Sequence, residues 1–254
     1  MKPEQLPDWR IYFAAQVAKV EGHDQLGAKP GDLVVTITET KTPEDGLVAF
    51  PVVSPYRLAL SIAIRASSDA KRLRKEVKFN LPPRGTKSKT IDFMTVTPLY
   101  DFFEQCMIAA TFSYQALETY ANQIIEQTLS DGRIITLQRR KGPESYNAEA
   151  LQREVSTEEK IATLLPDLLS LPLNKSSKLW QEFTILRRVR DAIIHLKSKD
   201  HYVGGSIDRE TVFYRLLNNS PPRYPRATLH LMRHFSGGAE LTWLDHAEER
   251  LKSA

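Results

Sequence analysis

Residues Leu186–Lys197 read Leu-Arg-Arg-Val-Arg-Asp-Ala-Ile-Ile-His-Leu-Lys and bring three arginines, one carboxylate and one imidazole close together. Apolar residues recur at helical spacing through this segment, at Leu179, Phe183, Leu186, Val189, Ile193 and Leu196. This stripe predicts a helix with one buried face. Charged groups are costly to bury, so the basic residues are expected to meet solvent, a partner or a ligand.

The polar residues of this helix fall into two groups by geometry. Arg188, Asp191 and His195 are three, four and seven residues apart and share a face away from the apolar stripe. Asp191 is therefore expected to accept a hydrogen bond from the His195 imidazole and to fix its tautomer. Arg190 and His195 lie about 140° apart on a straight helix. They can meet only if the helix ends there, distorts, or is completed by a second molecule.

These residue types suit RNA cleavage without a metal. A histidine such as His195 can take the proton from a ribose 2′-hydroxyl or give one to the leaving 5′-oxygen. Arg187, Arg188 and Lys197 can hold the phosphate and offset its growing charge. The alternative is a solvated basic face in which His195 interacts with the helix dipole. Spacing alone favours this alternative.

Composition limits the class of protein. The 254 residues are 41% hydrophobic and 26% charged, with a single cysteine. The sequence has no apolar run long enough for a membrane span and no secretory h-region at its start. We therefore expect no membrane partner and a cytoplasmic location. The formal net charge is +4 and basic residues cluster at 71–75 and 139–141, which suits a polyanionic partner.

Patterns along the chain predict a mainly α protein with a smaller strand-containing N-terminal region, α+β overall. Residues 8–53 are rich in strand and turn signals, and 56–77 favour a helix. Residues 80–90 are typical of an exposed linker. We therefore divide the chain into a mixed region, 1–90, and a helical domain, 91–254.

Helix boundaries follow from capping residues. Thr97 is the predicted N-cap, and Gly132 the predicted C-cap, of a helix of about thirty residues. Residues 133–137 suit a short strand or an extended crossing, which Gly142-Pro143 would break. Later helices are predicted with Ser156, Ser176 or Ser177, and Asp208 as caps, at 227–235, and at 243–251. Pro166 is expected to kink or shorten its helix.

The segment Arg190–His195 resembles the signature of the HEPN superfamily, in which an arginine and a polar residue precede a histidine. The similarity extends to Tyr114–Asn122, which resembles the long helix that carries Glu and Asn in many bacterial members. Glu158–Ile161 and Trp180–Phe183 are also similar to such proteins. The resemblance covers about residues 97–200.

The resemblance implies a helical bundle that forms a homodimer through the motif helix. It also implies a metal-independent endoribonuclease of a toxin–antitoxin, abortive-infection or CRISPR-linked system, without cofactor or metal. Other members are non-catalytic binding or dimerisation modules, and that alternative stays open. The motif places catalytic roles on Arg190, Asp191 and His195. Arg188 also has an allowed spacing, but Val189 follows it where the family prefers a polar residue.

Two further expectations concern the surroundings of the motif. Glu118 and Asn122 either support the site from a second layer or bond across the bundle. Some HEPN toxins carry a tyrosine two residues after the histidine that a partner enzyme modifies, whereas this chain has Lys197. Control by that modification is therefore less expected. Regulation by an antitoxin, or sensing through residues 1–90, remains an expectation.

Overall fold

The computed structural model describes residues 8–11, 14–16, 33–82, 84–85, 89–201, 211–239 and 241–253. Helices dominate this part of the chain, and its strands form small two-stranded antiparallel sheets. The predicted class, mainly α with strands in the N-terminal region, is therefore confirmed.

The strands pair as neighbours in the sequence. They are β1 (Ala14–Gln16), β2 (Leu33–Val35), β3 (Ile37–Thr42), β4 (Gly46–Pro51), β5 (Ile135–Arg139) and β6 (Gly142–Tyr146). The predicted break at Gly142-Pro143 is wrong, because these residues begin β6 and pair with β5. Gly142 has a φ of 123° at the turn, which its missing Cβ allows. Pro143 is tolerated because a two-stranded sheet leaves one side of each strand unpaired.

Two long helices, α1 (Pro55–Glu76) and α2 (Thr97–Thr128), pack along each other. The Ser54 side chain caps α1 by accepting the Arg57 N–H at 3.4 Å. Thr97 is not the N-cap of α2 as predicted, because it is already helical and Val96 takes the cap position without a side-chain bond. The predicted C-cap Gly132 lies beyond the helix, which ends at Leu129 as C-cap.

Short helices follow the β5–β6 hairpin: α3 (Ala148–Glu154), α4 (Thr157–Glu159) and α5 (Leu165–Leu169), with a π-helical turn at Lys160–Leu164. Ser156 caps α4 as predicted, accepting the Glu159 N–H at 3.2 Å. Pro166 was expected to kink or shorten the helix. The chain instead forms a π turn just before it, where the Leu165 N–H donates to the Lys160 carbonyl. Proline lacks an N–H, so the ordinary α pattern cannot continue through it.

The remaining helices are α6 (Lys178–Ile194), α7 (Val212–Asn218), α8 (Arg223–Phe235) and α9 (Thr242–Ser253). Ser177, one of the two predicted caps, accepts the Trp180 N–H at 3.2 Å at the start of α6. Thr211 caps α7, whereas the predicted cap Asp208 lies outside the described residues. Within the described ranges, no helix has both the length and the apolar character needed to cross a membrane.

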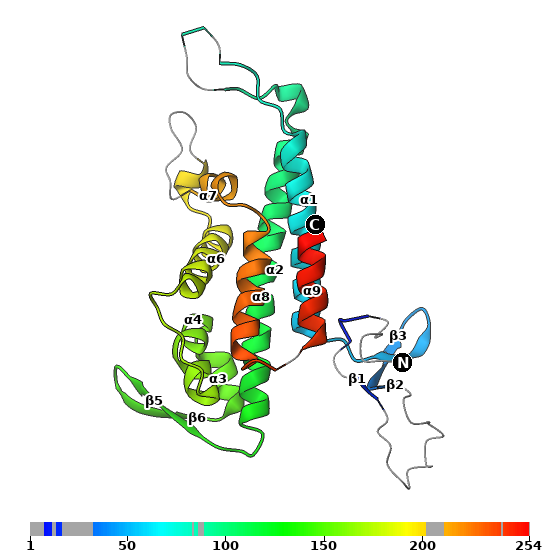
Figure 1. Cartoon of the computed structure of the whole chain (residues 1–254), viewed down its shortest axis with the longest axis vertical. Helices are drawn as coiled ribbons and strands as arrows, with labels where there is room; N and C mark the ends of the chain where they lie inside the picture. Colours follow the sequence, from blue (N-terminus) through cyan, green and yellow to red (C-terminus); the bar gives the residue numbers. More distant parts are fainter. Residues whose placement is uncertain are drawn as a thin grey trace.

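The long helices share one apolar core. Figure 1 shows α2 beside α1 and α8, with α9 next to α1 and with α6 and α7 on the opposite side of α8. Thr228 on α8 donates its hydroxyl to the Ser113 carbonyl on α2 at 2.8 Å. The predicted division at residues 80–90 falls between α1 and α2, where Asn80 and Thr90 form an isolated bridge. However, α1 on its N-terminal side contributes Tyr56, Leu60 and other residues to the same core.

Candidate functional site

Helix α6 presents the motif because its other face is fixed in the core. Phe183, Leu186 and Val189 are almost fully buried there. The Glu182 carboxylate is also buried and bonds the His230 imidazole of α8 at 2.9 Å. The buried part of the predicted apolar stripe thus orients the helix and leaves the opposite side to polar groups. Leu196, the last residue of the predicted stripe, instead lies past the end of α6 and is exposed.

The helix ends at the motif histidine. His195 is the C-cap residue, with φ −116° and ψ 63°, and its backbone N–H donates to the Asp191 carbonyl at 2.9 Å. Its side chain is exposed. The chain therefore leaves helical geometry at His195, which is one of the three conditions under which Arg190 and His195 could approach each other.

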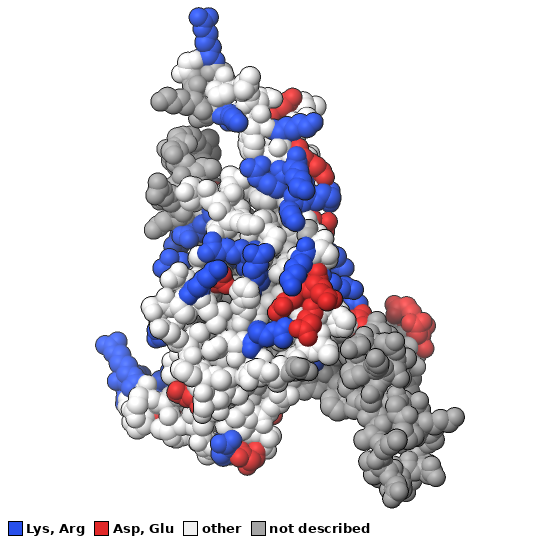
Figure 2. Space-filling model, viewed as in Figure 1, with Lys and Arg blue, Asp and Glu red and all other residues white. Residues whose placement is uncertain are grey.

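A pocket of about 600 Å³ lies at this end of α6. The described polar residues that line it are Arg188, Asp191, His195, Lys197, Asp200 and Arg215. The structure therefore brings together Arg188, Asp191 and His195, the three residues whose spacing predicted a common face. Among the described lining residues, cations outnumber carboxylates by three to two. Figure 2 shows Lys and Arg on the α6 side of the molecule and over the upper part of α1.

Arg190 is held beside the pocket rather than in its lining. Its guanidinium carbon lies 4.7 Å from the centroid of the Tyr114 ring on α2, and its Nη1 donates to Asp191 Oδ1 at 3.1 Å. Tyr114 is buried, and burial raises the pKa of its hydroxyl against the lowering effects of a Thr157 hydrogen bond and the Arg190 charge. The ring is therefore a neutral platform for the arginine.

The expected hydrogen bond between Asp191 and His195 is not formed. Among the described residues, the Asp191 carboxylate pairs with Arg190 and makes no bond to the imidazole. The reason is that the neighbouring guanidinium competes for the carboxylate, and that His195 no longer has helical backbone geometry. Asp191 thus orients the motif arginine in this structure.

The other predicted substrate-binding residues have separate positions. Lys197 lines the pocket. Arg187 instead forms an ion pair with Glu158 of α4 and ties α6 to that helix. Its Nε is buried without a hydrogen-bond partner among the described residues. Arg187 therefore serves the packing of α6 more directly than the pocket.

The second-layer candidates Glu118 and Asn122 lie near a buried lysine. Lys160 donates to Asn122 Oδ1 at 2.8 Å and to the Gln152 carbonyl at 2.6 Å. Burial lowers the pKa of Lys160, and the nearby Glu118 charge opposes this effect. Asn122 therefore makes a bond across the bundle, which is one of the two roles expected for it.

Asp200 and Arg215 line the pocket but were not predicted. Asp200 accepts the backbone N–H of Lys197 and that of Val212, each at 2.8 Å. It thereby connects the end of α6 to the start of α7, the helix that carries Arg215. The second bond spans twelve residues, so no local spacing rule could have revealed it.

Comparisons with protein-family models, curated proteins and solved structures gave no match to this chain.

Proposed function

We propose that the protein is a metal-independent endoribonuclease of a prokaryotic defence or toxin–antitoxin system, acting at the α6 pocket. The observation that carries the proposal is the pocket itself, where an exposed imidazole lies among Arg188, Lys197 and Arg215. A polyanion with a reactive hydroxyl next to its phosphate suits this combination. The HEPN resemblance, which rests on Arg190, Asp191 and His195, supports the same chemistry.

The reaction needs proton transfers at two oxygens. One base takes the 2′-hydroxyl proton while that oxygen attacks phosphorus, and one acid protonates the 5′-oxygen as its bond to phosphorus breaks. The products are a 2′,3′-cyclic phosphate and a 5′-hydroxyl end. In this proposal the His195 imidazole of one protomer carries out one of these two proton transfers, and Arg188 and Lys197 bind the phosphate. Arg190, whose guanidinium lies over the Tyr114 ring, becomes part of the site when a second protomer completes it.

A symmetric dimer would supply the second proton-transfer group. Within the described residues, the pocket lining contains one imidazole, that of His195. The residues on either side of it are apolar and exposed, Ile194 at 51% and Leu196 at 49%. Exposed apolar groups beside a polar pocket favour contact with another protein surface. A second copy meeting this end of α6 would bury them and bring a second His195.

One observation favours the alternative of a non-catalytic binding or dimerisation module. Arg190, the arginine best matched to the motif, is occupied by Tyr114 and Asp191 instead of lining the pocket. In that case α6 would serve assembly alone. The two functions then differ in whether His195 is required after the dimer has formed.

Cleavage of RNA by the purified protein in EDTA tests the proposal. Wild type should cut, and His195→Ala should lower the rate by about 10²-fold or more, the usual contribution of a positioned acid or base. His246→Ala on α9 is the matched control and should cut like wild type. No cleavage by wild type, or equal cleavage by His195→Ala, would favour the binding module instead.

A further inference from the structure

A second polar cavity, of about 500 Å³, lies where the N-terminal segment meets α1 and α9. Its polar side chains are arginines and serines: Arg10, Arg65, Arg250, Ser61, Ser68 and Ser253. Its volume is in the range of small-molecule sites. None of these residues belongs to the α6 pocket.

The N-terminal wall of the cavity is tied down by backbone contacts. Arg57 on α1 donates to the carbonyls of Trp9 and Ile11 at 3.3 and 2.6 Å. The Ser54 N–H donates to the Arg10 carbonyl at 2.8 Å. Trp9 and Arg10 are therefore held against α1 by bonds that do not use their own side chains.

Each of the two helices that line the cavity carries its polar groups at helical spacing on one face. Ser61, Arg65 and Ser68 are four and three residues apart on α1 and share one face. Arg250 and Ser253 are three apart on α9.

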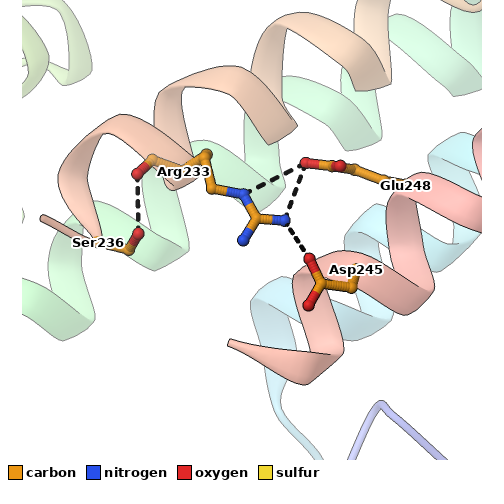
Figure 3. A network of polar contacts seen from close by, with 4 residues as sticks. All are labelled: Arg233, Ser236, Asp245 and Glu248. Carbon is orange, nitrogen blue, oxygen red and sulfur yellow. Dashed lines mark hydrogen bonds and ion pairs between the residues drawn. The ribbon is translucent and has the colours of Figure 1, made fainter. Parts of the chain in front are cut away.

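Helix α9 is also fixed relative to α8. Arg233 of α8 donates to Asp245 at 2.6 Å and to Glu248 at 3.1 Å, as Figure 3 shows. These two carboxylates of α9 are therefore engaged by another arginine. The α9 wall carrying Arg250 is held in place, and Asp245 and Glu248 of the same helix are already paired.

The described lining of the cavity carries a net positive charge. Among the described residues, no carboxylate lines it. Asp8 lies nearby and pairs with Arg10; this hydrogen bond lowers the pKa of Asp8, and the charges of Arg10 and Arg250 lower it further. Arg10 is thereby neutralised in part, whereas Arg65 and Arg250 are exposed. Trp9 adds a buried indole Nε1 that has no hydrogen-bond partner in the described part of the chain.

We propose that this cavity binds the phosphate group of a phosphorylated ligand, with Arg65 and Arg250 as its charged donors. Guanidinium groups form strong charge-assisted bonds to phosphate oxygens, and serine hydroxyls can donate to the same oxygens. The indole of Trp9 lies beside them as an aromatic wall. A ligand there would join the N-terminal segment, α1 and α9. The proposal is independent of the ribonuclease proposal, since it uses no residue of the α6 pocket.

Isothermal titration calorimetry with the full chain tests this site. The probes are pyrophosphate, AMP, adenosine, and an oligonucleotide with and without a 5′-phosphate. The oligonucleotide carries 2′-O-methyl groups, so it cannot be cleaved by 2′-hydroxyl attack. Pyrophosphate and AMP should bind, and adenosine should not. Arg65→Gln/Arg250→Gln should weaken binding by about tenfold or more, because two charge-assisted bonds are lost.

The matched control is Lys75→Gln/Lys252→Gln, which removes two charges from the same two helices outside this cavity. It should bind the probes like wild type. Binding of the 5′-phosphorylated oligonucleotide alone would identify a nucleic-acid end as the source of the phosphate. The absence of binding by every phosphorylated probe, or equal binding by the Arg65→Gln/Arg250→Gln protein, would overturn the proposal. Circular dichroism of each variant establishes that the fold is retained.

Discussion

At the scale of single residues, Tyr114 links the core to the motif. Its ring is buried in α2, and the Arg190 guanidinium lies 4.7 Å from the ring centroid. A guanidinium over an aromatic ring is attracted to the face and loses rotamer freedom there. Tyr114 is therefore a positioning residue for Arg190 if the pocket acts on RNA.

Two substitutions at Tyr114 distinguish the contribution of its ring from that of its hydroxyl. Tyr114→Leu should lower RNA cleavage by about twofold to thirtyfold, because a cation–π contact contributes about 0.5–2 kcal/mol. Tyr114→Phe keeps the ring and should retain most of the activity. The measurements are kcat, KM and the melting temperature of each variant. If both variants lost stability equally while kcat stayed unchanged, Tyr114 would have only a packing role.

The buried Lys160 predicts a pH effect on stability. Burial lowers its folded-state pKa below the ordinary value of 10.5. In the interval between those two pKa values the unfolded chain binds more protons, so raising the pH favours the folded state. This contribution is complete above pH 10.5 and is lost as the pH falls through the folded-state pKa.

Lys160→Met tests the expected direction of this pH effect on stability. At neutral pH the variant should be less stable by about 1–3 kcal/mol, because Asn122 and the Gln152 carbonyl lose their donor. The gap in free energy of unfolding between wild type and variant should widen from about pH 7 to about pH 10.5, the ordinary lysine pKa. Urea unfolding at both pH values measures it, with Lys178→Met accounting for loss of a surface charge. A gap that narrowed with pH would contradict the assigned burial effect.

At the scale of elements, local rules predicted what is decided locally. Ser156 and Ser177 cap their helices because each accepts an N–H three residues ahead, a signal contained in a few residues. Thr97 and Gly132 failed because α2 begins after a short 3-10 turn at Phe93–Thr95 and ends in a turn before the glycine. Competition between adjacent turns is not visible in the spacing of apolar residues.

The candidate site divides in the same way. Helical spacing placed Arg188, Asp191 and His195 on one face, and all three line the α6 pocket. Spacing could not place Arg190, whose position depends on the Tyr114 ring of another helix. Arg215 was missed because it comes from α7, which Asp200 connects to the end of α6. Contacts between separate elements therefore set the limit of prediction from the sequence.

At the scale of the whole molecule, the N-terminal part and the bundle are connected. Trp9 belongs to the same buried cluster as the long helices, and α1 packs along α2, α8 and α9. The phosphate cavity and the α6 pocket are both built on this shared core. A ligand in the first could therefore affect the stability of the core that positions the second, through elements in contact.

The proposed composite site predicts how mixed dimers behave. If each active site needs the imidazoles of both protomers, a dimer of wild type and His195→Ala has no complete acid–base pair. Subunit exchange in an equal mixture should then leave about one quarter of the wild-type rate, since about one quarter of the dimers contain two intact chains. A site complete within one protomer would leave about one half. Measuring cleavage after exchange across a series of mixing ratios separates a squared dependence on the wild-type fraction from a linear one. A linear dependence in a protein shown by sedimentation to be dimeric would place the whole site in one chain, with Arg188, Lys197 and Arg215 around a single His195.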